Sequence, residues 1–256
     1  MLRIRTSVVL ITSLALLGAC SNDESNGGTT VASAPETTET TAPLDTTAPA
    51  TAASTTAAAP TAASTTTVPA EMQPAIWPAA DVVLTTPEAA ANDFLDKIFG
   101  EGPVLGEFMA GDPRSGEFEV FATAEGTPIG EARSVLFVRQ LGPDDGWFVL
   151  AAASDVATIT TPVSIATVPA GMLTVEGLGT GFEATIVVSA FVTGQSGSEL
   201  DREVTMAGNL GEALPYAVSL DLSAAAPGDV VVLLIRGGTG LETDPGDFAA
   251  VPVIIG

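Results

Sequence analysis

Beyond Thr160 the chain alternates between short apolar runs and turn residues. Val, Ile, Leu, Thr and Ala dominate the runs, while Gly, Pro, Asp and Asn dominate the separators. The runs cover residues 163–168, 172–177, 184–192, 200–206, 216–220, 229–236 and 248–255. Seven short strands within about 95 residues, with a turn signal between successive strands, are typical of a β-sandwich of immunoglobulin-like size. The pattern therefore predicts such a sandwich over residues 161–256.

One amphipathic helix is predicted upstream of this region. Thr86-Pro87-Glu88 has the order of a helix start, in which an N-cap residue precedes proline at the first helical position and an acid in the first turn. Apolar residues then recur at helical spacing and Gly100 marks the end of the helix. The apolar face consists of Ala91, Phe94, Leu95 and Ile98. We expect this face to pack on the sheet that follows.

A sheet is predicted immediately after the helix. Residues 117–121 alternate acidic and apolar side chains, as a strand with one solvated face does. Apolar runs at 134–141 and 147–150 flank a Gly-Pro-Asp-Asp-Gly turn, which indicates a β-hairpin. Asp144 and Asp145 are interpreted as turn formers rather than metal ligands. Residues 77–160 are therefore predicted to form a small α+β module, and the fold class is mostly β.

The N-terminus carries the pattern of a secretion signal. Arg3 and Arg5 precede an apolar stretch that is too short to span a bilayer and that ends in Leu17-Gly18-Ala19-Cys20. This segment resembles the lipobox of bacterial lipoproteins. The resemblance implies that residues 1–19 are removed and that Cys20 receives a diacylglyceryl thioether. The expected location is extracytoplasmic, with the lipid on Cys20 as the membrane anchor.

Residues 20–76 are expected to form a disordered tether. Thr, Ala, Ser and Pro make up most of the segment, which contains scattered acids and no Lys or Arg. It offers too little apolar surface to offset an ordering entropy of roughly 1–2 kcal/mol per residue. A tether behind a lipid anchor would hold the folded part away from the membrane.

Charge and missing residue types restrict the function. The chain has 8 basic and 31 acidic residues and a formal charge of −23, which excludes nucleic acid as a partner. Histidine is absent and the anchor uses the single cysteine, so Ser-His-Asp, Cys-His and His/Cys zinc sites are excluded. The Gly-rich run at 237–240 lacks the lysine and the spacing of a phosphate loop. The sequence therefore predicts a protein that is not an enzyme and has no cofactor.

The C-terminal region resembles a known family. From Pro162 to the C-terminus it is similar to the immunoglobulin-like domain of bacterial spore germination, the Gmad2 type. The matching elements are Thr161-Pro162-Val163, Thr174-Val175-Glu176-Gly177, residues 182–188 and Ala250-Val251-Pro252-Val253. The resemblance implies an extracytoplasmic β-sandwich in envelope proteins, joined to other modules and without catalytic residues to carry over. The Cys-Trp-Cys core of antibody domains is absent, so the likeness to them is architectural.

These observations predict a lipid-anchored envelope protein that displays an immunoglobulin-like binding or scaffolding module to an envelope protein or a cell-wall polymer. The favoured recognition site is the acidic loop at 237–247, with Glu242, Asp244 and Asp247, and a merely solvated loop is an equal alternative. The same three carboxylates could instead bind Ca²⁺, although the loop lacks the EF-hand pattern. A third alternative is an envelope hydrolase that depends on Asp and Glu alone.

Overall fold

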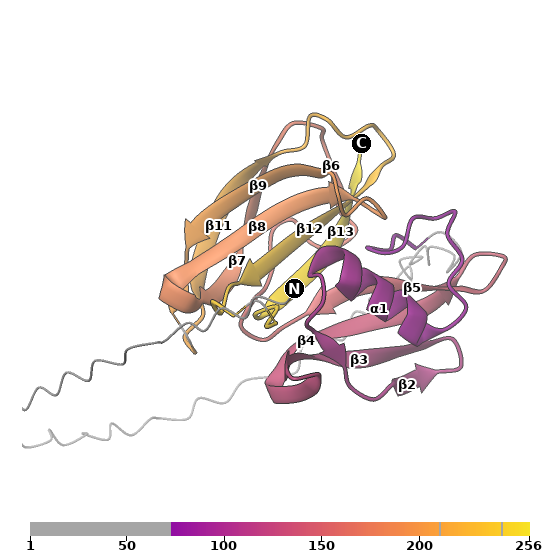
Figure 1. Ribbon diagram of the computed structural model, residues 1–256. Helices are drawn as coiled ribbons and strands as arrows, with labels where there is room; N and C mark the ends of the chain where they lie inside the picture. Colours follow the sequence, from indigo (N-terminus) through magenta and orange to yellow (C-terminus); the bar gives the residue numbers. More distant parts are fainter. Residues whose placement is uncertain (1–72, 210, 242) are drawn as a thin grey trace, which may run out of the picture. The chain divides into compact units, whose positions relative to one another are not determined.

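The computed structural model describes residues 73–209, 211–241 and 243–256 (Figure 1). The predicted signal segment, Cys20 and residues 20–72 of the predicted tether lie outside the described residues. No helix within the described ranges is long and apolar enough to span a membrane. The elements are α1 (Pro87–Ile98), β1 (Val104–Leu105), β2 (Met109–Asp112), β3 (Ser115–Ala124), β4 (Thr127–Leu141), β5 (Gly146–Ala153), β6 (Thr167–Val168), β7 (Met172–Gly181), the 3-10 turn η2 (Phe182–Ala184), β8 (Thr185–Val192), β9 (Glu199–Met206), β10 (Gly208–Asn209), β11 (Leu214–Asp221), β12 (Val230–Gly237) and β13 (Phe248–Ile255).

The predicted helix is confirmed as α1. Thr86 is its N-cap, because the Thr86 Oγ1 atom accepts a hydrogen bond of 3.1 Å from the backbone N–H of Ala89. Gly100 follows the last turn with a φ of +77°, which glycine adopts without strain. Four side chains of the helix are buried, namely Ala90, Ala91, Phe94 and Leu95. They pack on the sheet, as the apolar spacing predicts.

The predicted hairpin is also confirmed. β4 and β5 are antiparallel, and Leu141 pairs with Gly146 where the turn closes. Asp145 lies in that turn with a φ of 50°, and its carboxylate binds Arg114 at 2.6 Å. The positive φ is typical of a turn residue, and the Asp145 carboxylate is paired with Arg114. β3 pairs with the other edge of β4, and β1 and β2 both pair with β3.

The strands of the predicted sandwich fall into two sheets. The larger sheet has the order β1-β3-β4-β5-β13-β12-β8-β9, with β6 beside β13, and the smaller one has the order β10-β7-β11. β7 and β11 cover one face of β8, β12 and β13 (Figure 1). The mostly β class with an immunoglobulin-like domain is thereby confirmed. Six of the seven predicted strands appear, and the first apolar run is reduced to β6.

The two larger apolar cores among the described residues lie on opposite faces of the larger sheet. Val232 and Leu234 of β12 belong to the core beneath α1, whereas Val231, Leu233 and Ile235 belong to the core between the two sheets. A strand whose two faces are both buried needs apolar residues at every position. This requirement explains the unbroken apolar run at 230–235.

The core beneath α1 includes residues from both sides of the predicted boundary at 160/161. Phe94, Phe118 and Trp147 of the first segment pack with side chains that follow residue 161. The later members are Phe191, Val232, Leu234, Phe248 and Ala250. The two predicted modules therefore share a core. Ala75 and Ile76, the last residues of the predicted tether, are buried in the folded part.

Candidate functional site

The 237–247 loop connects β12 to β13, which are adjacent antiparallel strands. Its base is closed by a hydrogen bond of 2.9 Å from the Gly237 N–H to the Asp247 carbonyl oxygen. Gly246 has a φ of +71°, and a Cβ atom at this position would overlap the carbonyl oxygen of Gly237. Gly246 therefore permits a close backbone approach to Gly237 that a larger residue at position 246 would prevent.

Asp244 anchors this loop to β4. Its Oδ1 atom accepts a hydrogen bond of 3.1 Å from Arg133 Nε, and its Oδ2 atom accepts one of 2.7 Å from an Arg133 terminal nitrogen. The Gly246 N–H donates a further bond of 3.0 Å to Oδ1. The Asp244 side chain is only 4% exposed. Because both oxygens are occupied and buried, Asp244 has a structural role here.

Asp247 lies at the end of the same loop and has a different environment. It is half-buried and forms no salt bridge with the described residues. Burial raises the pKa of Asp247 above its ordinary value of 3.8, and Arg133 partly opposes this shift, whereas Asp244 and Glu131 reinforce it. The protonated form of Asp247 is therefore favoured more than that of an exposed carboxyl group.

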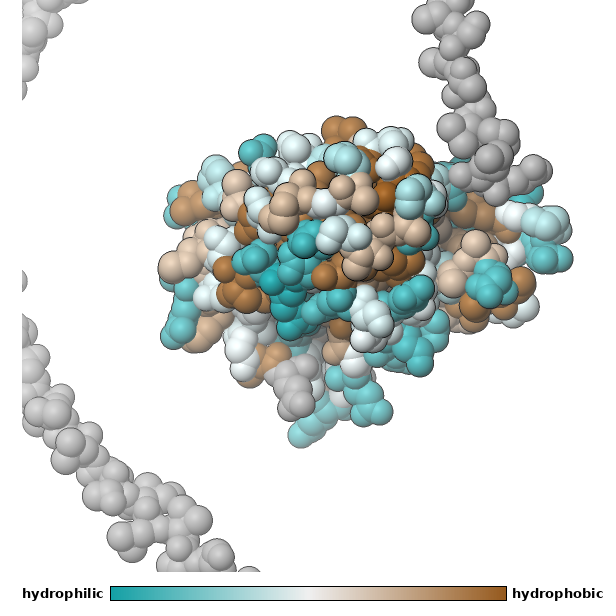
Figure 2. Space-filling view, turned by 90° about the horizontal axis from the view of Figure 1, so that it is seen from above, coloured by the Kyte–Doolittle hydropathy of each residue, from teal (hydrophilic) through white to brown (hydrophobic). Residues whose placement is uncertain are grey.

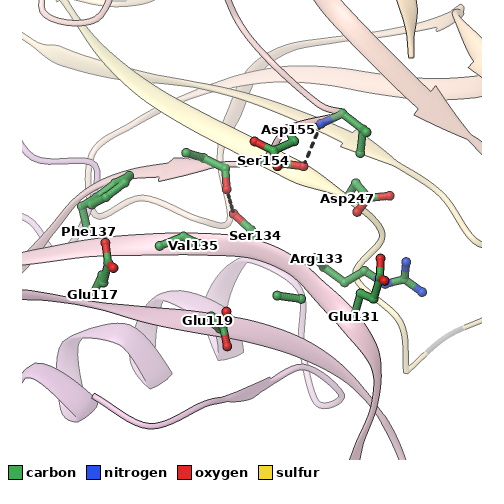
Figure 3. A pocket seen from close by; sticks show the side chains of 13 residues that line it. Glu117, Glu119, Glu131, Arg133, Ser134, Val135, Phe137, Ser154, Asp155 and Asp247 are labelled. Atoms are coloured by element: carbon green, nitrogen blue, oxygen red, sulfur yellow. Dashed lines mark hydrogen bonds between the residues drawn. The ribbon is translucent and has the colours of Figure 1, made fainter. Parts of the chain in front are cut away.

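Asp247 borders a cavity of about 560 Å³ between β3, β4, β5 and the start of β13 (Figure 3). Five of the thirteen lining residues are acidic, and Arg133 is the one basic residue among them. The acidic residues are Glu117, Glu119, Glu131, Asp155 and Asp247. Ser134 and Ser154 also line the cavity, and Ser134 Oγ donates a hydrogen bond of 3.0 Å to the Ala153 carbonyl oxygen. Such a lining suits a ligand that donates hydrogen bonds or carries positive charge.

The structure brings together two of the predicted site residues. Asp244 and Asp247 both lie beside Arg133, whereas Glu242 and Cys20 fall outside the described residues. Sequence reasoning missed Arg133 and Glu131, which β4 contributes from more than one hundred positions earlier in the chain. An arginine within a strand carries no local signal of its distant partner.

The calcium alternative lacks support from the part of the chain that the structure describes. In that part, no group of three or more His, Cys, Asp or Glu side chains is arranged to hold a metal ion. Calcium prefers six to eight oxygen ligands, and Asp244 would have to give up Arg133 to supply any. The described carboxylates of this loop therefore do not converge on a cation site.

The fold and the comparisons agree on the class of module. Two sheets packed face to face with one shared core form an immunoglobulin-like β-sandwich. Residues 156–236 match the family model of the immunoglobulin-like domain of bacterial spore germination, Gmad2. The match ends within β12, so it leaves out β13, which the sequence resemblance includes as the exit strand. No curated protein and no solved structure matches the chain.

Proposed function

We propose that this protein is a lipid-anchored envelope protein that presents an immunoglobulin-like module for binding or scaffolding outside the cytoplasm. The Leu17-Gly18-Ala19-Cys20 sequence after a short apolar stretch carries the proposal of the anchor. The Gmad2 match supports a non-catalytic surface module. An envelope protein or a cell-wall polymer is the proposed partner.

The point at which the proposed tether meets the folded part supports a presenting role. The Ala75 carbonyl oxygen accepts a hydrogen bond of 3.1 Å from Thr193 Oγ1, directly after β8. Thr193 in turn donates its backbone N–H to Val230 at the start of β12. The 237–247 loop follows the other end of β12, roughly 20 Å away at the rise of a strand. The chain from the anchor therefore enters at the end of this sheet that is opposite the acidic loop.

Replacing the acceptor cysteine tests the anchor. With labelled fatty acid supplied to the producing bacterium, the wild-type protein should carry label and sediment with membranes. Cys20→Ser should abolish the label and leave an unprocessed precursor, because serine cannot form the thioether. Ser21→Ala is the matched control and should retain the label. A mature form that begins at another residue and carries no lipid would overturn the proposal.

One observation favours the hydrolase alternative as a second candidate. Asp247, whose pKa is raised, shares its cavity with Glu131, and an acid and a base carboxyl group can together cleave a glycosidic bond. Hydrolysis of an envelope polysaccharide that is lost in Asp247→Asn and in Glu131→Gln, but retained in Glu117→Gln, would support this candidate. The proposed binding role predicts no hydrolysis by the wild-type protein.

A further inference from the structure

Arg236 in β12 forms no salt bridge within the part of the chain that the structure describes. The residue is half-buried. Among the described arginines, Arg114, Arg133 and Arg202 each bind a carboxylate at 2.6 to 2.8 Å, whereas Arg139 and Arg236 do not. The Nε atom of Arg139 is buried without a hydrogen-bond partner. Of these two arginines, Arg236 is the one that lines the cavity described below.

The surroundings of Arg236 make its charge costly. Burial is the largest cause that lowers the pKa of Arg236, the nearby positive charge of Arg202 lowers it further, and Glu199 acts in the opposite direction. Glu199 already binds Arg202 at 2.8 Å, so its charge is shared. A partly desolvated cation of this kind is stabilised by an anion that supplies the missing hydrogen-bond acceptors.

Arg236 lines a cavity of about 460 Å³, which shares no lining residue with the acidic cavity. Much of the remaining lining is apolar, with the backbone of Gly238, Thr239 and Gly240 along one side. The apolar side chains are Phe99, Pro103, Val187, Leu241 and Pro245. Asp244 also lines the cavity, but Arg133 holds its carboxylate in a site that is 4% exposed. Its charge is therefore already compensated.

The walls of this cavity are held by packing on the core beneath α1. Phe99 follows the last turn of α1 and packs on Phe248 of β13 with ring centroids 4.5 Å apart. Val187 of β8 lies directly opposite Arg236 in the register of the sheet. Leu241, on the loop side, is 62% exposed although it is apolar. Figure 2 shows that hydrophobic residues do reach the surface among hydrophilic ones. An apolar ligand group would cover Leu241.

We propose that the Arg236 cavity binds a ligand in which a single carboxylate is attached to an apolar group, as in the C-terminal residue of a peptide that ends in an apolar side chain. The planar guanidinium fork matches a carboxylate through two parallel hydrogen bonds. The apolar walls accommodate the rest of the residue. The strong negative charge of the protein disfavours a doubly charged group such as phosphate. This inference rests on the proposed binding role but not on the lipid anchor.

A titration with small probes tests the ligand class. The protein is the chain from residue 20 with Cys20→Ser, which retains every described residue and both cores. N-acetyl-leucine should cause saturable amide shifts at 238–241 and a shift of the Arg236 Nε–H resonance in nitrogen-15 spectra. N-acetyl-leucinamide lacks the charge and should bind at least about tenfold more weakly, as expected for a lost charge-assisted hydrogen bond. Inorganic phosphate should not displace N-acetyl-leucine.

Variants of the arginine distinguish this site from non-specific binding. Arg236→Gln should abolish binding without lowering the melting temperature, because it removes an unpaired charge. Arg236→Lys keeps the charge but loses the fork, so it should bind more weakly than the wild type. Arg114→Gln, at a distant exposed pair, is the matched control and should bind normally.

Equal affinity for the amide, displacement by phosphate, undiminished binding by Arg236→Gln or absence of saturable binding would overturn the inference. None of these results bears on labelling at Cys20. Failure of this inference and failure of the proposed anchor are therefore distinguishable.

Discussion

Arg133 and Asp244 are 111 positions apart in the sequence and are joined by two hydrogen bonds of 3.1 and 2.7 Å. The pair connects β4 of the α+β segment to the loop that precedes β13. Asp244 is 4% exposed and Arg133 is 28% exposed, so water screens the interaction only partly. A loop that sequence patterns mark for recognition thus depends on a structural ion pair at its base.

Breaking this pair should destabilise the protein. Arg133→Gln leaves the Asp244 carboxylate buried without its partner, and we expect a loss of about 2 to 3 kcal/mol in the free energy of unfolding. Arg114→Gln is the matched control, because the Arg114–Asp145 pair has side chains that are 50% and 64% exposed. Exposed ion pairs contribute little to stability, so Arg114→Gln should change the free energy of unfolding by no more than about 0.5 kcal/mol. Denaturant unfolding measures both, and equal losses would contradict the structural role of the buried pair.

Asp247 should make stability depend on pH in the opposite sense to a salt-bridged carboxylate. Burial raises the pKa of Asp247 in the folded protein above the unfolded value, taken here as 3.8. The contribution of Asp247 to the free energy of unfolding is therefore fully present below the unfolded pKa and is lost as pH rises through the folded pKa. Asp247→Asn removes this loss. We therefore expect the variant to be more stable than the wild type at about pH 7 and to lose that advantage towards about pH 3. Melting curves across this pH range test the sign of the stability difference between Asp247→Asn and the wild type. A variant that is less stable than the wild type at neutral pH would contradict the prediction.

Tyr216 provides a test within the sandwich core. Its hydroxyl group donates a hydrogen bond of 3.1 Å to the Thr158 carbonyl oxygen, and its side chain is buried. Tyr216→Phe removes the hydroxyl donor and should lower the free energy of unfolding by about 1 to 2 kcal/mol. Burial raises the pKa of Tyr216 above 10.0, so the wild-type protein should lose stability as pH rises above that value, whereas the variant lacks this loss.

Tyr216 is the only tyrosine in the chain, so the absorbance of tyrosinate reports its ionisation directly. Ionisation of the native protein near pH 10, without unfolding, would contradict the buried hydrogen bond. The gap in stability between wild type and Tyr216→Phe should narrow as pH increases above the unfolded pKa.

Local signals account for the elements that the sequence predicts well. Thr86 and Pro87 start α1 through their own backbone and side-chain chemistry, and the Gly-Pro-Asp-Asp-Gly turn closes the hairpin. The apolar run at 163–168 was misleading because Val163 is 69% exposed and Ile165 has a φ of 67°, so only Thr167 and Val168 pair as a strand. Apolar composition alone does not show that side chains are buried.

Long-range pairing explains what the sequence could not provide. Asp244 and Asp247 lie on the predicted loop, yet their roles depend on Arg133 and Glu131 of β4. Arg236 is similar, because its cavity is closed by Phe99 at the end of α1. The predicted boundary after residue 160 rests on the change from a helical pattern to strand patterns along the chain. The unbroken apolar run of β12 was the available sign that another layer covers its second face.

The shared core predicts a single unfolding transition. Both tryptophans, Trp77 and Trp147, report on the core beneath α1, whereas circular dichroism in the far ultraviolet reports on strands in both sheets. Phe94→Ala removes a fully buried ring from α1 and should cost about 3 to 4 kcal/mol. Because Phe191, Val232 and Phe248 lie in the same core, we expect this change to shift the fluorescence and dichroism transitions together.

Leu220→Ala is the matched change in the other core, where Leu220 is fully buried between the two sheets. It removes apolar volume from the core that contains neither tryptophan and should still move the fluorescence transition, since β12 and β13 belong to both cores. If Phe94→Ala shifted only the fluorescence transition and Leu220→Ala only the dichroism transition, the segments before and after residue 160 would fold independently. Coincident shifts in both variants would show that β12 and β13 couple the helix-covered layer to the sandwich.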